Sequence, residues 1–235
     1  MYASASGMAA QQQNLDVIAD NLANADVVAF KSAQATFAPL GPNAMLGTIS
    51  TGVRVSVAQG KLEHSGGAFD VALDGPGFFV VERDGIRAYT RAGSFSRAAD
   101  GSLRNAQGWQ LHGIRIPATA QSVAVADDGD VTAEIGGRRV RAGRIALAAF
   151  NAPENLRTID AAVFVATPLS GAARPLGAGG DRHTKIAFGM LEKSNVSIVE
   201  SMMAILAAQR AYEANAKGVQ AADEMLRIAN NLHRS

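Results

Sequence analysis

The sequence predicts an α+β protein: a central all-β domain flanked by N- and C-terminal α-helices that form a coiled-coil-like helical layer. Apolar residues recur every seven positions near both chain ends, and Asp-Gly pairs separate short apolar runs through the middle. Apolar residues make up 48% of the 235 positions, enough for a buried core. We expect helical segments at 1–38 and 189–235, a connector at 39–59 and the β-domain at 60–188.

The N-terminal segment carries a seven-residue apolar spacing at Met8, Leu15 and Leu22, with Ile18 on the companion row. A helix that ends near Asn24 would span roughly 35 Å at 1.5 Å per residue. We predict that these four apolar residues contact other subunits. The other interpretation, a surface helix docked on its own domain, stays open from the spacing alone.

The middle of the chain alternates apolar runs with turn signals. Residues 39–59 contain Pro and Gly breakers and are interpreted as a connector. Strands at 78–83 and 86–91 flank an Asp-Gly pair that favours a two-residue hairpin turn. A second hairpin is predicted around Asp128-Gly129, followed by one or two further strands that end near Phe150. This regular pattern predicts the β-domain.

The C-terminal segment contains the longest predicted helix, at 197–232. Ser197 and Glu200 form a capping-box pattern at its start. Apolar residues recur every seven positions along it, and a companion row begins with Met202. We predict subunit contacts for Ile198, Met202, Ile205, Tyr212, Val219 and Leu226.

The lengths and polarity of the two helices favour an assembly of several chains. The second helix would span roughly 54 Å, so part of its seam would stay bare beside the first helix of the same chain. The seam also carries Gln209, Asp223 and Asn230, which would need partners in a dry two-helix interface. These polar residues suit a crowded assembly in which neighbours and water surround each helix.

Composition excludes several classes of function. The formal net charge of +1 gives no electrostatic reason to expect nucleic acid or anionic lipid as a partner. The chain has no cysteine, so disulfides, thiolate zinc sites and cysteine nucleophiles are excluded. The N-terminus lacks the pattern of a cleaved signal peptide, and no apolar run approaches the roughly 20 residues of a membrane span.

No candidate active site emerges from the sequence. The Asp-rich tract at 127–130 lacks the closing Glu of a calcium loop, because Arg138 stands at that position, and a hairpin turn explains it better. The four histidines lack metal-ligand spacing. The basic cluster at 138–144 has no interleaved aromatic residue and is interpreted as a solvated strand face. Trp109 is expected to be a core or strand-edge residue rather than a platform for a ligand. We therefore predict no enzymatic activity, no cofactor and no metal.

Both terminal segments resemble signatures of flagellar rod and hook proteins. "NLDVIADNLANADVVAFKS" is similar to the N-terminal signature of that family, and "SNVSIVESMMAILAAQRAYEANAKGVQAADEML" to the C-terminal one. "DVALDGPGFFVV", "AYTRAGSFSRAADGSL" and "GWQL" resemble its shared β-domain. The resemblance implies a structural subunit of the bacterial flagellar basal-body rod, with the terminal segments in an inner helical layer and the β-domain outside it.

The resemblance also implies partners and a location. The partners would be copies of the chain, other flagellar rod and hook proteins, the flagellar type III export apparatus and envelope ring proteins. The location would be the periplasm-spanning rod of the basal body, a helical tubular drive shaft that links the motor to the hook, reached without cleavage of a signal peptide. "QRAYEANAK" looks most like the distal-rod type, whereas "GKLEHSGGAFDVAL" looks more like the proximal-rod type. The distal rod is favoured.

Two departures from the family pattern affect the end of the first helix. Ala29 and the valines before it stand where the pattern has Thr and Gly, and Asp20 replaces an Asn. A glycine would permit a left-handed turn, which Ala29 makes costly. We therefore expect the chain to leave its first helix by a different route.

Two other classes of function are weighed against the rod. One is a closed coiled-coil dimer that acts as a scaffold or chaperone-like envelope protein, which would form a small oligomer at all concentrations. The other is a β-sandwich hydrolase or carbohydrate-binding module, which would need a polar constellation that the sequence does not display.

Overall fold

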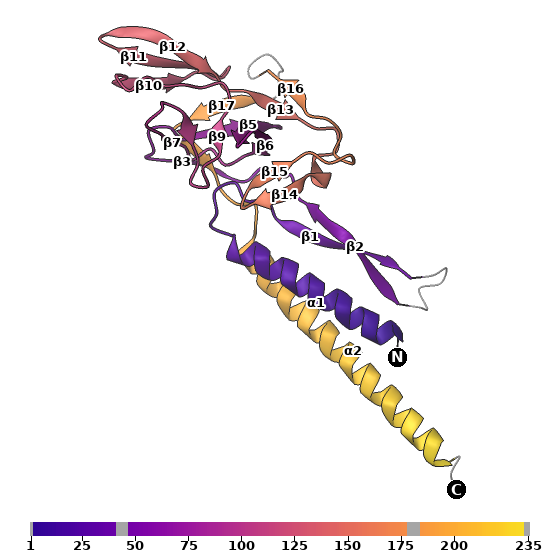
Figure 1. The fold of residues 1–235 in the computed structure, drawn as a ribbon. Helices are drawn as coiled ribbons and strands as arrows, with labels where there is room; N and C mark the ends of the chain where they lie inside the picture. Colours follow the sequence, from indigo (N-terminus) through magenta and orange to yellow (C-terminus); the bar gives the residue numbers. More distant parts are fainter. Residues whose placement is uncertain (1, 41–46, 178–183, 233–235) are drawn as a thin grey trace. The chain divides into compact units, whose positions relative to one another are not determined.

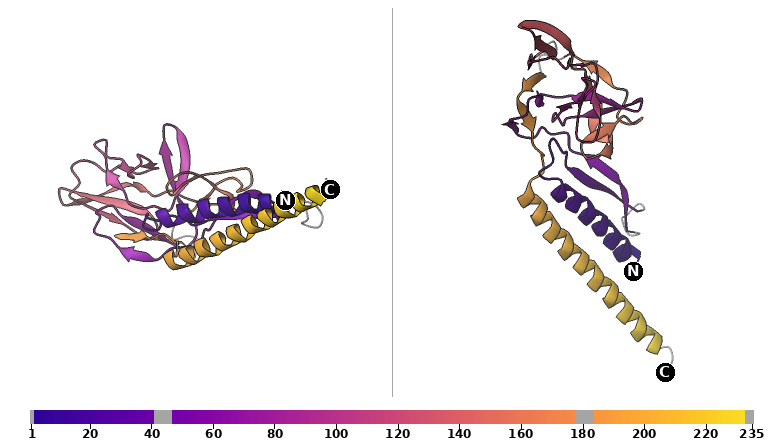
Figure 2. Two further views of the ribbon diagram at one scale, coloured as in Figure 1. Left: turned by 90° about the horizontal axis from the view of Figure 1, so that it is seen from below. Right: turned by 60° about the vertical axis from the view of Figure 1, so that its left-hand side comes forward.

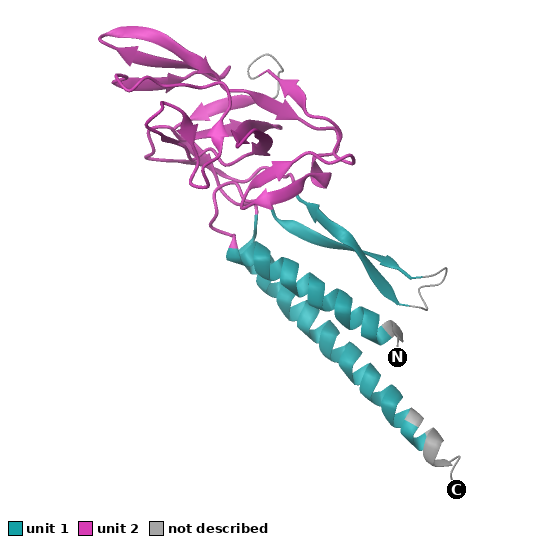
Figure 3. Ribbon diagram, viewed as in Figure 1, with its two compact units in different colours: residues 1–23, 32–56, 196–235 teal, residues 24–31, 57–195 magenta. Residues whose placement is uncertain are grey.

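The computed structural model describes residues 2–40, 47–177 and 184–232 (Figure 1). The chain divides into two compact units (Figure 3). Unit 1 consists of residues 1–23, 32–56 and 196–235, and unit 2 consists of residues 24–31 and 57–195. Each unit therefore contains segments from both halves of the sequence, and each is described by itself.

Unit 1 contains the two predicted helices, α1 (Tyr2–Ala23) and α2 (Ile198–Leu232). They lie side by side in both views of Figure 2. A Cβ atom on Gly7 would lie 3.1 Å from Nδ2 of Asn215, and one on Gly218 would lie 3.6 Å from Oγ of Ser4, so the helices run antiparallel at close range. The difference of 13 residues leaves about 20 Å of α2 without α1 beside it.

Local sequence signals explain where α2 begins. Oγ of Ser197 accepts a hydrogen bond of 3.3 Å from the N–H of Glu200, which confirms Ser197 as the N-cap. Glu200 also places a negative charge in the first turn, where the helix dipole favours it.

Unit 1 also holds a β-hairpin, β1 (Ala33–Pro39) with β2 (Thr48–Val55), which are antiparallel. Residues 39–59, interpreted from the sequence as a connector, thus contain a strand. The Pro and Gly breakers dominated that interpretation, whereas the β-branched residues Ile49, Thr51 and Val53, spaced by two, favour a strand.

The hairpin is tied to the end of α1 by Asn21. Its Nδ2 donates to the carbonyl of Ala33 at 2.7 Å, and its Oδ1 accepts from the N–H of Ala33 at 2.7 Å. Ser6 accepts from the N–H of Thr48 at 3.1 Å near the other end of the helix. Helix α1 therefore packs on its own hairpin as well as on α2.

Unit 2 is built around a nine-stranded sheet within its described residues. The predicted hairpin is confirmed as β5 (Phe78–Arg83) and β6 (Ile86–Thr90), which pair antiparallel. Asp84 and Gly85 both have positive φ, 53° and 78°, as the tight turn between right-twisted strands requires. The other strands of the sheet are β7 (Ser96–Arg97), β8 (Leu103–Arg104), β9 (Gln110–Leu111), β13 (Leu147–Ala149), β14 (Arg157–Asp160), β15 (Val163–Val165) and β16 (Arg174–Leu176).

Smaller sheets complete unit 2. The second predicted hairpin is confirmed as β10 (Ser122–Val125) with β11 (Asp130–Ile135), and Gly136-Gly137 turns the chain into β12 (Arg138–Arg144). A short 3₁₀ turn, η1 (Pro153–Asn155), precedes β14. The remaining strands are β3 (Leu62–His64), paired with β18 (Met190–Glu192), β4 (Val71–Asp74), paired with β17 (Lys185–Phe188), and the three-stranded sheet of β10 (Ser122–Val125), β11 (Asp130–Ile135) and β12 (Arg138–Arg144).

The core of unit 2 surrounds Trp109, which is 1% exposed, as predicted. Leu73, Phe79 and Leu111 are fully buried in the same cluster. The guanidinium carbon of Arg83 lies 4.3 Å from the centroid of the Trp109 ring and covers its outer side. These residues form the hydrophobic core of unit 2.

Candidate assembly surfaces

The face of α2 that meets α1 is built from small side chains. Ala208 is the most buried of them, at 4% exposed, and Ser201, Ala204 and Ala211 are half-buried. Small residues let two helices approach closely, which agrees with the short separation at Gly7. The contact between α1 and α2 therefore uses little of the large apolar side-chain area that α2 carries.

Large apolar side chains lie on the outward face of the first three turns of α2. Val199, Met202, Met203 and Leu206 are 67%, 53%, 58% and 57% exposed, and their spacing places them on one face. We call these four residues the outer stripe. Contiguous exposed apolar surface of this kind marks an interaction site in a soluble protein.

The far end of α2 is bare as well. Met225 is 65% exposed and Ile228 is 51% exposed, in the part of the helix that α1 does not reach. The sequence predicted that part of the longer seam would stay uncovered within one chain, and in the structure these two side chains are exposed.

The predicted contact residues divide into two groups. Tyr212 is 40% exposed, and Ile198 and Met202 are also exposed. The side chain of Leu226 lies outside the described residues. The half-buried members are Met8, Leu15, Ile18, Leu22, Ile205 and Val219. Their role in contacts between subunits stays a prediction.

The seven-residue pattern predicted both helices but did not predict which face of α2 packs on α1. A straight helix drifts about 20° per heptad relative to a strict seven-residue repeat, so one row of the pattern does not stay on one face. The small residues that face α1 carry no strong apolar signal. The seven-residue pattern did not include Val199, Met203 and Leu206. A search for apolar residues three and four positions apart would have identified them, because such residues lie on one face of a helix.

Unit 2 contains a buried charged cluster formed by Lys31, Arg91 and Glu192. Nζ of Lys31 lies 2.5 Å from one carboxylate oxygen of Glu192, and Nε of Arg91 donates to the other at 2.7 Å. The first oxygen also accepts from the N–H of Gly60 at 2.8 Å. All three charged side chains are 4% exposed or less. The cluster joins the segment after α1, the segment after β6 and strand β18.

Backbone carbonyls accept further hydrogen bonds from both cations of the cluster. Arg91 donates to the carbonyls of Gly75 and Gly77 at 2.9 and 2.8 Å, and Lys31 donates to the carbonyl of Ala58 at 2.7 Å. Burial lowers the pKa of Lys31 from its ordinary value, an effect that the Glu192 carboxylate opposes only in part. The cluster contains two cations and one carboxylate, so Glu192 is the residue on which its charge balance depends.

Ala29 corrects the expectation for the exit from α1. It adopts φ of 54°, the left-handed conformation that a glycine would favour, so the chain does not take a different route. The N–H of Ala29 donates to the backbone carbonyl of Glu192 at 2.7 Å, and the N–H of Asn195 donates to the carbonyl of Phe30 at 3.2 Å. These hydrogen bonds and full burial hold Ala29 in a conformation that alone is unfavourable.

Among the described residues, no group of three His, Asp or Glu side chains is placed to hold a metal ion. His183 and His233 lie outside the described residues. The basic strand β12 is largely exposed, and Nη2 of Arg141 lies 2.6 Å from Oδ1 of Asp130. This exposure agrees with the interpretation of the basic cluster as a solvated strand face. Neither α1 nor α2, as far as they are described, is apolar enough over its length to cross a membrane.

Comparisons with known proteins identify the family of this chain. Three family models match the chain: "Flagella basal body rod protein" over residues 1–31, "Flagellar hook protein FlgE/F/G D1 domain" over residues 72–133, and "Flagellar basal body rod FlgEFG protein C-terminal" over residues 188–232. The flagellar basal-body rod protein FlgG of Borreliella burgdorferi is 35% identical, over 100% of this chain and 98% of its own length. The chain belongs to the flagellar basal-body rod protein family.

Two other relatives in this family indicate which type of rod protein the chain resembles more. FlgG of Agrobacterium fabrum is 36% identical over 97% of this chain and 96% of its own length. FlgF of Caulobacter vibrioides is 31% identical over 97% of this chain and 95% of its own length. The FlgG type is therefore favoured over the FlgF type. Membership makes this chain a structural protein of the flagellar basal body and not an enzyme.

Proposed function

We propose that this rod-family chain assembles with copies of itself, through its terminal helices, into the helical tubular drive shaft that links the flagellar motor to the hook. The outer stripe of α2 is the observation that carries this proposal, because all four of its side chains are more than half exposed, at 53–67%. Burial of such side chains against neighbouring subunits is favourable by about 25 cal/mol per Å² of apolar area.

The geometry of unit 1 favours an open assembly over a closed one. In the proposed assembly, α1 of the same chain covers the inner face of α2, and a neighbour covers the outer stripe with another part of its own surface. Contacts between two different surfaces are heterologous, and they generate an open helical array when the rotation between neighbours does not close. The closed coiled-coil dimer, the second candidate, requires a self-complementary seam.

The terminal helices are proposed to order fully only during assembly. An isolated helix in water is marginal, and most helical stability comes from packing. With the stripe exposed and part of α2 unpaired, the free chain lacks much of that packing. Each binding event must then supply the ordering free energy, which limits premature polymerisation.

Within the rod, the distal position is proposed, with the proximal position next. FlgG of Caulobacter vibrioides is 35% identical to this chain and FlgF of the same organism is 31% identical, which supports this order. We further propose that the chain contacts other rod and hook proteins, the flagellar type III export apparatus and envelope ring proteins, and that it is exported without cleavage of a signal peptide into the periplasm-spanning rod.

The test replaces Val199, Met203 and Leu206 together by serine in motile cells. The control variant replaces three exposed alanines of the same helix, Ala207, Ala214 and Ala221, by serine, which loses at least as much helix propensity and leaves the stripe intact. We expect the stripe variant to be made but to stop rod growth, and the control to remain motile. Electron micrographs of basal bodies measure the outcome.

Normal rods in the stripe variant would overturn the role of the stripe. Sedimentation of the purified chain distinguishes self-assembly from the second candidate, the closed coiled-coil dimer. Self-assembly predicts a monomer in dilute solution and large species as the concentration rises. A small closed oligomer at every concentration would instead establish the scaffold dimer.

A further inference from the structure

Two of the four side chains in the outer stripe of α2 are methionines, Met202 and Met203, and both are more than half exposed. The sequence contains seven methionines and no cysteine, so thioethers are the only sulfur groups of the chain. A thioether reacts with peroxides, and its sulfoxide product is polar. The structure therefore places oxidisable sulfur within the apolar surface that the proposed function uses.

The described methionines outside α2 are less exposed than these two. Met8 of α1 and Met190 of β18 are half-buried. The far end of α2 carries one further exposed methionine, Met225, at 65%. A peroxide must reach the sulfur atom to react, so the exposed methionines of α2 should be oxidised before Met8 and Met190.

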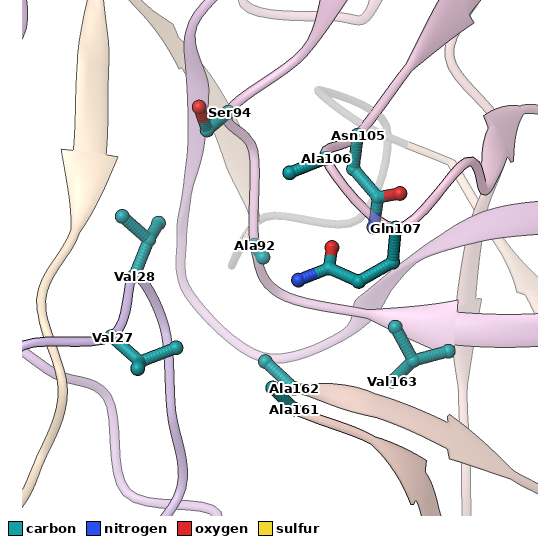
Figure 4. Close-up of a pocket in the computed structure, with 10 residues that line it drawn as sticks. All are labelled: Val27, Val28, Ala92, Ser94, Asn105, Ala106, Gln107, Ala161, Ala162 and Val163. Carbon is teal, nitrogen blue, oxygen red and sulfur yellow. The ribbon is translucent and has the colours of Figure 1, made fainter. Parts of the chain in front are cut away.

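The surface pocket of unit 2 offers a peroxide no comparable site. The pocket has a volume of about 200 Å³, and Figure 4 shows ten residues that line it. Their side chains are apolar, hydroxyl or amide groups, and none contains sulfur. The oxidation should therefore change α2 and leave the lining of this pocket unaltered.

The reaction of hydrogen peroxide with methionine changes only the sulfur group. The thioether sulfur attacks one peroxide oxygen, an S–O bond forms, the O–O bond breaks, and water is released. The sulfur is oxidised by two electrons, and the peroxide is reduced to water. A methionine sulfoxide reductase restores the thioether, while a dithiol is oxidised to a disulfide and the oxygen leaves as water.

The sulfoxide oxygens would find no hydrogen-bond donor on the neighbouring side chains of α2. The residues one turn away from Met202 are apolar: Ile198, Val199, Ile205 and Leu206. Those one turn away from Met203 add only an alanine and a carboxylate, which accepts but does not donate: Ala207 and Glu200. A neighbouring surface that fits apolar thioethers would therefore bury two sulfoxide oxygens without partners from α2, which is unfavourable.

We propose that Met202 and Met203 form an oxidation site that controls assembly: a peroxide converts both thioethers to sulfoxides in the free chain and so prevents the outer stripe from binding a neighbouring subunit. The site rests on the proposed function, because only an assembly through the stripe gives the oxidation this consequence. The neighbour that covers the stripe in the assembly also keeps a peroxide from the sulfur atoms. The modification therefore acts on the chain before it assembles.

The test compares the full-length chain before and after treatment of the dilute sample with hydrogen peroxide. Peptide mass spectrometry measures the gain of one oxygen atom at each methionine, and sedimentation measures the concentration at which large species form. We expect Met202 and Met203 to be oxidised at least about threefold faster than Met190. The oxidised chain should assemble only at a concentration about tenfold higher, or more. Treatment with a sulfoxide reductase and dithiothreitol should restore the original concentration.

A double variant, Met202→Leu with Met203→Leu, keeps the stripe apolar and removes its sulfur. Leucine is close to methionine in volume and helix propensity. The matched control, Met225→Leu, removes an exposed methionine outside the stripe. Each variant is compared with itself before and after peroxide. The concentration for assembly should stay the same in the double variant and rise in the control as it does in the unchanged chain.

An unchanged concentration for assembly, in a chain with sulfoxides at both Met202 and Met203, would overturn this inference and leave the proposed function intact. Protection from peroxide by Met225→Leu, or oxidation of Met202 and Met203 no faster than that of Met190, would also overturn it. The reversal by the reductase decides the question if the double variant does not fold. Failure of the untreated, unchanged chain to form large species at any concentration would overturn the proposed function as well.

Discussion

At the scale of single residues, Glu192 holds segments of unit 2 together through both its carboxylate and its backbone carbonyl. Its carboxylate neutralises Lys31 and Arg91, and its backbone carbonyl accepts the N–H of Ala29. A buried charge is tolerated only when it is paired and hydrogen-bonded. The two cations are far apart in sequence, so Glu192 fixes the segment after α1 and the segment after β6 to one strand, β18.

Replacement of the carboxylate should cost far more than replacement of one cation. Glu192→Gln leaves two buried cations without a counter-charge and should lower the free energy of unfolding by about 3–5 kcal/mol. Lys31→Met leaves an Arg91–Glu192 pair and should cost about 1 kcal/mol. Denaturant unfolding followed by the fluorescence of Trp109, the one tryptophan of the chain, measures both. Equal costs would contradict this account of the charge balance.

Ala29 should gain stability on replacement by glycine. The left-handed conformation costs a non-glycine residue about 1–2 kcal/mol, and the greater freedom of glycine in the unfolded chain costs roughly 0.5–1 kcal/mol. Ala29→Gly should therefore raise the free energy of unfolding by about 0.5–1 kcal/mol. The control is Ala88→Gly, fully buried in strand β6, which should lower it. A loss of stability at both positions would show that Ala29 is not strained.

At the scale of elements, the sequence predicted those that rest on local signals. The capping pattern at Ser197 located the start of α2, and the Asp-Gly pairs located two hairpins, because caps and tight turns are set by neighbouring residues. The face that α2 turns to α1 was not predictable from the seven-residue pattern, since small residues such as Ala208 make that contact. The hairpin of β1 and β2 was missed because breakers outweighed a weak strand signal.

The free chain should show low amide protection in its terminal helices. In α1 and α2 the packing is incomplete, whereas the strands around Leu73 and Leu111 belong to a closed core. Hydrogen exchange of the dilute monomer should therefore find fast exchange in both helices and slow exchange in β5 and β9. Strong protection through all of α2, including the turns near Met225, would contradict the proposal that assembly orders the termini.

At the scale of the whole molecule, each compact unit combines segments that are distant in sequence. Unit 1 draws α2 to α1 across most of the chain, and unit 2 brings Lys31 to Glu192. Such long-range contacts explain why the class of fold and the family were predictable while the charged cluster of Lys31, Arg91 and Glu192 was not. The cluster arises only after separate segments fold together, and no local pattern in the sequence predicts it.

The central claim is that the outer stripe of α2 is a surface completed by neighbouring copies. Its most direct measurement uses the cysteine-free chain with the single substitution Met203→Cys. The rate of maleimide labelling is compared between the dilute monomer and the chain in purified basal bodies. The account predicts rapid labelling of the monomer, where Met203 is 58% exposed, and strong protection in the basal body. Equal labelling rates in the two states would contradict it.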